Sequence, residues 1–139
     1  MTDRLEAGRR VVREMLGEPF LGALEAAAAS GDFGCAAAQL ALGGAFGDVW
    51  ARPGLERKQR SLVTMGILIA LRTPAELKNH IRAALANGCS ATEIEETIIQ
   101  SIPYAGFPAA AIALTAAAEV LKERGLLGRA KTAEERGLL

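Results

Sequence analysis

The stretch "RTPAELKNHIRAALANG", Arg72 to Gly88, carries the start and stop signals of one complete helix. Thr73 suits the N-cap, Pro74 the first helical position, and Glu76 the third position of a capping box. Gly88 suits the left-handed residue that follows the last turn of a helix. The stretch therefore predicts a helix from Thr73 to Gly88.

This predicted helix contains the only histidine of the chain, His80. His80 falls on the apolar stripe, because the helical spacing i, i+3, i+4, i+7, i+8 selects Leu77, His80, Ile81, Ala84 and Leu85. Two interpretations stay open at this point. His80 is either a core residue hydrogen-bonded to a carbonyl, or the proton carrier of an active site. A buried imidazole tends towards its neutral form, which suits a base or a hydrogen-bond partner.

The flanking sequence predicts an all-α fold of about six to seven helices. "SATE" offers a second capping box, Ser90 with Glu93, ahead of a helix that runs into "PYAGFP". Pro53-Gly54 indicates a loop. Further helices are expected over residues 5–16, 19–29, 33–49, 56–71 and 108–125. We expect one all-helical domain at 1–125 and a charged C-terminal tail at 126–139.

The composition excludes several classes of function. The formal net charge is zero and only 4% of the residues are aromatic, so nucleic-acid binding is not expected. The longest apolar runs fall short of the roughly 20 residues that a membrane span needs. The N-terminus shows no secretory signal, and the two cysteines, Cys35 and Cys89, lie far apart; both features favour the cytoplasm. One histidine and two cysteines that lie far apart offer few ligands for a metal site, so no metal is expected.

Alanine-rich helix faces bury little area per residue, and the helix at 56–71 is apolar nearly all round in its second half. Such a helix is expected to be buried against something. We therefore expect a homo-oligomer.

Three segments together resemble the carboxymuconolactone decarboxylase family: "FGDVWARPGLERKQRSLVTMGILIAL", "PAELKNHIRAALANGCSATEIEETIIQ" and "PYAGFPAAAIA". The resemblance covers nearly the whole chain and implies a small all-helical subunit in homo-oligomers, commonly trimers or hexamers. One branch of the family reduces peroxides with a CxxC and a relay glutamate. The corresponding positions here hold Thr73, Glu76 and Ser61, so this chain lacks the thiol pair of that chemistry.

The other branch implies a carboxy-lyase: cofactor-independent decarboxylation of 4-carboxymuconolactone to the β-ketoadipate enol-lactone, in the catabolism of aromatic compounds. The lactone serves as its own electron sink, so no cofactor is expected. Two alternatives stay open. One is an enzyme of the same fold acting on another lactone, unsaturated carbonyl compound or β-keto acid. The other is a non-catalytic oligomeric binding protein.

The resemblance also implies site residues. His80 is the expected catalytic residue, as proton donor or as hydrogen-bond donor to the enolate, and Arg60 and Arg52 are expected to hold carboxylate. Trp50, Tyr104 and Phe46 are expected to line the substrate pocket. The alternatives are surface charges for the two arginines and packing roles for the three aromatic residues.

Overall fold

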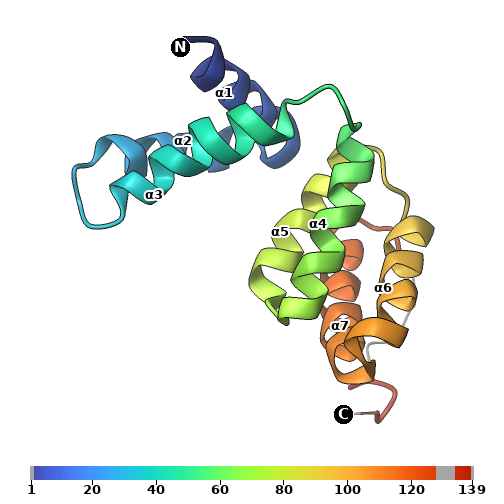
Figure 1. Ribbon diagram of the computed structural model, residues 1–139. Helices are drawn as coiled ribbons and strands as arrows, with labels where there is room; N and C mark the ends of the chain where they lie inside the picture. The colour runs from blue at the N-terminus through green and yellow to red at the C-terminus, as the bar shows by residue number, and fades with distance from the viewer. Residues whose placement is uncertain (1, 128–133, 139) are drawn as a thin grey trace. The chain divides into compact units, whose positions relative to one another are not determined.

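The computed structural model describes residues 2–127 and 134–138, and every regular element in these ranges is helical (Figure 1). This confirms the predicted all-α class. Seven α-helices and one π-helical segment are present among the described residues. They form two compact units, with the boundary between Arg57 and Lys58. The predicted domain at 1–125 covers both units, and its unity stays a prediction.

The first unit is built on the packing of its first helix along a π-helix. Its elements are α1 (Thr2–Leu16), α2 (Glu18–Ala29), α3 (Cys35–Gln39) and the π-helix η1 (Leu40–Trp50). Glycines allow the close approach of α1 and η1: a Cβ on Gly8 would lie 2.0 Å from the carbonyl oxygen of Leu42. The buried apolar side chains of this unit are Val11, Val12, Met15, Leu21, Leu42 and Phe46.

The second unit is a helical cluster around its last helix. Its elements are α4 (Arg57–Leu71, of which Arg57 still belongs to the first unit), α5 (Pro74–Ala86), α6 (Ala91–Ala105) and α7 (Phe107–Glu123). The alanine-rich α7 packs against both α5 and α6. Alanines such as Ala113 and Ala116 are fully buried, and their small size lets the neighbouring helices approach closely. The core also holds Met65, Ile69, Leu77, Ile81, Ile94 and Ile98.

The two predicted capping boxes have different outcomes. At Ser90 the box is complete: the Ser90 hydroxyl accepts from the Glu93 N–H, and the Glu93 carboxylate accepts from the Ser90 N–H, both at 3.0 Å. At Thr73 the prediction of a box is wrong. Thr73 is the N-cap residue of α5, but its hydroxyl donates to the carbonyl of Leu68 at 3.3 Å. Only Arg72 and Thr73 connect α4 to α5, so the cap residue also closes the preceding helix.

The prediction of a single helix over 33–49 is also wrong in its detail. The chain forms the short helix α3 and then widens into η1, which continues to Trp50. Wide π-turns of this length are unusual. Here the widened backbone is held from outside, since the Arg4 guanidinium donates to the carbonyl of Gly43 and pairs with Asp48 at 2.8 Å.

Part of the predicted tail at 126–139 lies outside the described residues, namely 128–133 and 139. Within the described part, Glu135 lies 3.4 Å from the Lys122 ammonium of α7. Over the same described ranges, no helix has both the length and the apolar character needed to cross a membrane.

Candidate functional site

His80 lies at the edge of the buried stripe of α5. Leu77, Ile81 and Ala84 on the same helix are almost completely buried, whereas His80 is half-buried. Its Nδ1 atom is shielded from solvent. The stripe predicted from the sequence is therefore present, and the imidazole lies between the core and the surface of the second unit.

The surroundings of His80 favour the neutral imidazole. Burial lowers the pKa of His80, and the carboxylate of Glu76, one turn earlier on α5, opposes this to a smaller extent. Because the ordinary pKa of histidine is about 6.5, the lowered pKa leaves His80 uncharged at pH 7. A neutral imidazole offers one N–H donor and one acceptor nitrogen, and both suit an enolate-forming reaction.

The lowered pKa makes the stability of the fold depend on His80 at mildly acidic pH. The unfolded chain binds a proton at His80 more readily than the folded chain does. The contribution of the neutral His80 to the free energy of unfolding is therefore complete above pH about 6.5, and it is lost as the pH falls through the folded-state pKa. We expect the free energy of unfolding to fall more between pH 7.5 and 5 for the wild type than for His80→Gln. Urea unfolding at both pH values measures this difference. Equal pH dependence of the two proteins would contradict the half-buried, neutral imidazole.

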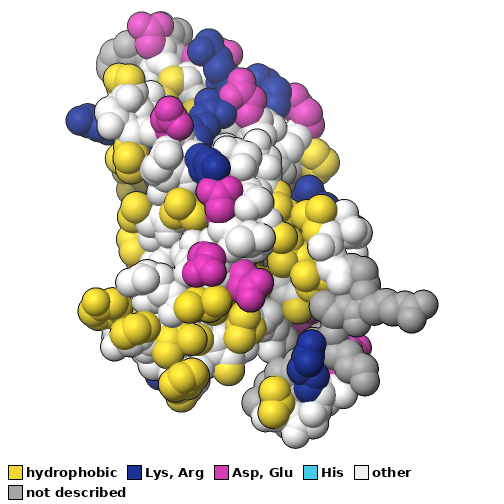
Figure 2. Space-filling view, turned by 90° about the vertical axis from the view of Figure 1, so that its right-hand side faces the viewer, with side chains coloured by type: hydrophobic (Ala, Val, Ile, Leu, Met, Phe, Trp, Pro, Cys, Tyr) yellow, Lys and Arg dark blue, Asp and Glu magenta, His cyan; other side chains and the backbone are white. Residues whose placement is uncertain are grey.

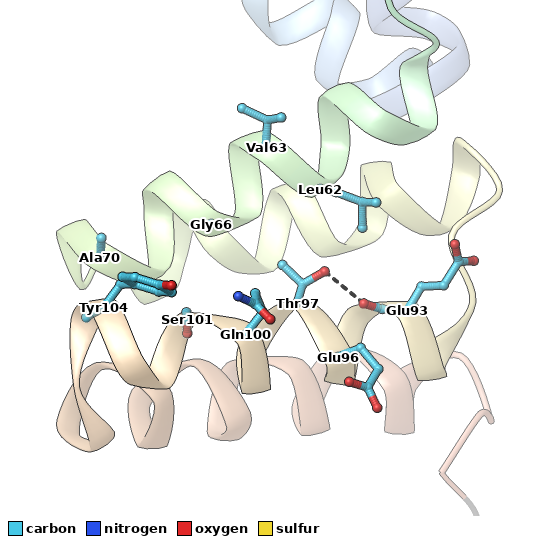
Figure 3. Close-up of a pocket in the computed structure, with 11 residues that line it drawn as sticks. Leu62, Val63, Gly66, Ala70, Glu93, Glu96, Thr97, Gln100, Ser101 and Tyr104 are labelled. Atoms are coloured by element: carbon cyan, nitrogen blue, oxygen red, sulfur yellow. Dashed lines mark hydrogen bonds between the residues drawn. The ribbon is translucent and has the colours of Figure 1, made fainter.

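Arg60 and Tyr104, the other site residues predicted in the second unit, lie on α4 and α6. Arg60 is half-buried, and its carbonyl accepts from the Thr64 hydroxyl at 2.8 Å. Tyr104 is 85% exposed near the end of α6. It lines a groove of about 680 Å³ between α4 and α6, with Ala70 close to its ring (Figure 3). Neither His80 nor Arg60 lines this groove, so the groove does not bring either residue together with Tyr104.

The groove is apolar on the side of α4 and mixed on the side of α6. Leu62, Val63 and Gly66 line it from α4, and Glu96, Thr97, Gln100, Ser101 and Tyr104 line it from α6 (Figure 3). The hydroxyl of Thr97 donates to the carbonyl of Glu93 at 2.8 Å. Of these α6 residues only Tyr104 was predicted from the sequence, although Thr97, Gln100, Ser101 and Tyr104 follow the i, i+3, i+4, i+7 spacing of one helix face.

The first unit contains the remaining predicted site residues. Trp50 and Arg52 line one cavity of about 290 Å³, together with Arg10 of α1 and Arg57 at the start of α4. Phe46 is not part of the lining; it is 9% exposed and belongs to the apolar core of this unit. The structure thus groups Trp50 with Arg52 and adds two arginines, Arg10 and Arg57, that were not among the predicted site residues. The roles of all these residues stay predictions.

Ser61, which occupies the position of the relay glutamate in the peroxide-reducing branch, is completely buried. The side-chain amide of Asn87 donates to its hydroxyl at 3.0 Å, which ties α4 to the C-terminus of α5. Cys89, also buried, has its Sγ 3.7 Å from the carbonyl of Lys58, and burial raises the pKa of its thiol. Both residues are therefore tied into the packing of the second unit.

The sequence matches the Carboxymuconolactone decarboxylase family over residues 36–119. Over 82 residues it is 46% identical to 4-carboxymuconolactone decarboxylase of Acinetobacter baylyi, covering 59% of this chain and 61% of that protein. Over 64 residues it is 47% identical to nitrosuccinic acid decarboxylase of Metarhizium robertsii, covering 46% and 45%. An uncharacterized 15.0 kDa protein of Paracoccus denitrificans is 40% identical over 80 residues, covering 56% and 60%. The chain thus spans about half to three fifths of the length of these curated relatives.

Proposed function

Because the chain belongs to the carboxymuconolactone decarboxylase family, we propose that it is a decarboxylase acting on 4-carboxymuconolactone. The product is the β-ketoadipate enol-lactone, and the reaction is a step in the catabolism of aromatic compounds. The observation that carries the proposal is the 46% identity to a protein named for this activity. The family match at 36–119 includes His80 and every other predicted site residue.

Decarboxylation of this substrate needs only a few groups from the protein. As the bond to the carboxylate breaks, its electron pair moves through the ring C=C into the lactone carbonyl and leaves an enolate. The enzyme must stabilise the enolate oxygen and deliver a proton to the ring carbon beside the carbonyl. The half-buried, neutral His80 supports the role of hydrogen-bond donor to the enolate oxygen; to deliver the proton to carbon, the imidazole must first take up a proton. Arg60, in the same unit, is the proposed partner for carboxylate.

A second candidate substrate class follows from the similarity to nitrosuccinic acid decarboxylase. Nitrosuccinic acid and 4-carboxymuconolactone both place a carboxyl group on a carbon from which electrons can flow into a sink. They also share a second carboxylate. An enzyme of this family acting on another such acid would use the same His80. A non-catalytic binding protein, in contrast, would turn over neither compound.

We also propose that the protein assembles as a homo-oligomer, a trimer or hexamer. In support, the outer side of α4 leaves large apolar side chains in contact with solvent: Val63 is 56%, Ile67 53% and Leu71 63% exposed. Hydrophobic side chains gather on the lower part of one face, in the second unit (Figure 2). Contiguous exposed apolar surface of this kind is typical of protein interfaces.

The decisive experiment follows CO2 release and proton NMR in D2O, with 4-carboxymuconolactone and nitrosuccinic acid offered separately. The proposal expects rapid loss of CO2 from the lactone and one deuterium on the carbon beside the lactone carbonyl. Preferential turnover of nitrosuccinic acid would replace the proposed substrate with the second class. Absence of turnover of both compounds by the well-folded protein would overturn the proposal of a decarboxylase.

A further inference from the structure

We propose that the cavity of the first unit lined by Arg10, Arg52 and Arg57, here named the arginine cavity, binds a small dicarboxylate. This inference rests on the proposed function only for the choice of ligand class, since the substrate proposed above carries a carboxylate and an acetate arm. It adds Arg10, which lies before the region matched by the family, and Arg57 to the predicted pair Trp50 and Arg52.

The arginine cavity is formed by one face of α1 and the loop that follows η1. Ala7, Arg10 and Val11 face it from α1, at the i, i+3, i+4 spacing of one helix face. The opposite wall runs from Trp50 to Arg57, and the complete lining is Ala7, Arg10, Val11, Trp50, Ala51, Arg52, Pro53, Leu55, Glu56 and Arg57. Val11 is almost completely buried, so its side of the cavity is continuous with the core of the unit. The volume, about 290 Å³, is close to the lower end of the range for small-molecule pockets.

The charge of the cavity is the main argument for an anionic ligand. Of the four arginines of α1, three lie outside the cavity and pair with acids: Arg4 with Asp48, Arg9 with Glu25 and Arg13 with Glu18. Arg10 faces the cavity and, within residues 2–127 and 134–138, forms no ion pair. Across the cavity, Arg57 is held by Glu14, which fixes the position of its guanidinium. Among the described residues that line the cavity, Glu56 is the only acidic one, against three arginines, of which Arg57 is already paired with Glu14.

The arginines and the tryptophan of the lining favour a ligand that carries more than one carboxylate group. A guanidinium presents its N–H groups as a fork that matches a carboxylate in two parallel hydrogen bonds. Arginines on α1 and on the facing loop can each take one carboxylate, so a ligand with two carboxylates gains from both walls. The half-buried Trp50 adds a flat apolar surface beside them. A short-chain or ring dicarboxylate fits this combination.

The tryptophan makes the test specific, because Trp50 is the only tryptophan in the chain and lines the cavity. Succinate and maleate are titrated into the intact protein while calorimetry records binding and tryptophan fluorescence records its location. Acetate and chloride at matched ionic strength are the controls. We expect saturable binding of a dicarboxylate with a change in Trp50 fluorescence, and much weaker effects of acetate and chloride.

Arg10→Gln is expected to raise the Kd about tenfold or more, since a charge-assisted hydrogen bond is lost. Arg10→Lys keeps the charge but lacks the forked pair of N–H donors. Its Kd is expected to lie between those of the wild type and Arg10→Gln. The matched control is Arg13→Gln on the same helix: Arg13 pairs with Glu18 outside the cavity, so the Kd is expected to stay unchanged. Circular dichroism of each variant verifies that α1 is folded.

Two results would overturn the inference. One is no saturable binding of either dicarboxylate by calorimetry. The other is equal weakening by Arg10→Gln and Arg13→Gln, which would indicate non-specific attraction of anions. Binding is measured without turnover. A negative binding result can therefore be distinguished from a negative result for the proposed decarboxylation. An active enzyme with an empty arginine cavity would overturn only the inference, and dicarboxylate binding without turnover would overturn only the proposed activity.

Discussion

Replacement of His80 by glutamine is expected to lower kcat for the proposed decarboxylation by about 10²- to 10⁴-fold, the range for loss of a proton-transfer group. Glutamine keeps a hydrogen-bonding side chain of similar length but cannot exchange a proton near neutral pH. His80 is the only imidazole in the chain, so no second histidine can take over. The measurement is steady-state CO2 release at pH 7.5, together with circular dichroism.

The matched control is Asn79→Ala, one residue away on α5. The Asn79 side chain accepts a hydrogen bond from the guanidinium of Arg82, so its removal perturbs the same helix without touching the imidazole. We expect kcat within about threefold of the wild type for this variant, a change small beside the loss expected at His80. If a folded His80→Gln protein kept wild-type kcat, His80 would be a core residue and the catalytic interpretation would be wrong.

The two predicted capping boxes show what short sequence patterns can and cannot specify. Ser90 adopts φ −85° and ψ 164°, the extended conformation that directs a cap side chain to the N–H groups of the following turn. Thr73 adopts φ −112° and ψ 80° instead. It follows Arg72, whose left-handed φ of 56° ends α4, and the N–H of Thr73 bonds back to the Leu68 carbonyl. The pattern predicted the start of α5 correctly, but the short connection to α4 decided where the hydroxyl points.

The candidate site was predictable only in part, because its residues are brought together by contacts far apart in the sequence. The helical spacing placed His80 beside the buried Leu77 and Ile81, and this is confirmed. In contrast, Arg10 joins Arg52 in one cavity only because α1 packs back along η1. No local pattern at Arg10 distinguishes it from its neighbour Arg9; what differs is that Arg9 pairs with Glu25 of α2.

The packing that brings α1 to η1 leads to the largest expected effect on stability. A Cβ on Gly8 would lie 2.0 Å from the Leu42 carbonyl oxygen, and a Cβ on Gly47 would lie 2.2 Å from the Arg4 carbonyl oxygen. Both oxygens belong to helical backbone, so neither can move aside without separating α1 from η1. We expect Gly8→Ala and Gly47→Ala each to lower the free energy of unfolding by about 3 kcal/mol or more, at the upper end for overpacking.

Gly22 of α2 is the matched control for these two variants, because nothing lies within 4 Å of a Cβ built on it. Gly22→Ala is expected to stabilise the protein by about 0.5–1 kcal/mol, since alanine loses less conformational freedom in a helix. Urea unfolding of the three variants separates the cost of a close backbone contact from the general effect of the substitution. If Gly8→Ala and Gly22→Ala had similar stabilities, α1 would not lie this close to η1. The arginine cavity would then lose its α1 wall, so this stability measurement also tests the geometry on which dicarboxylate binding depends.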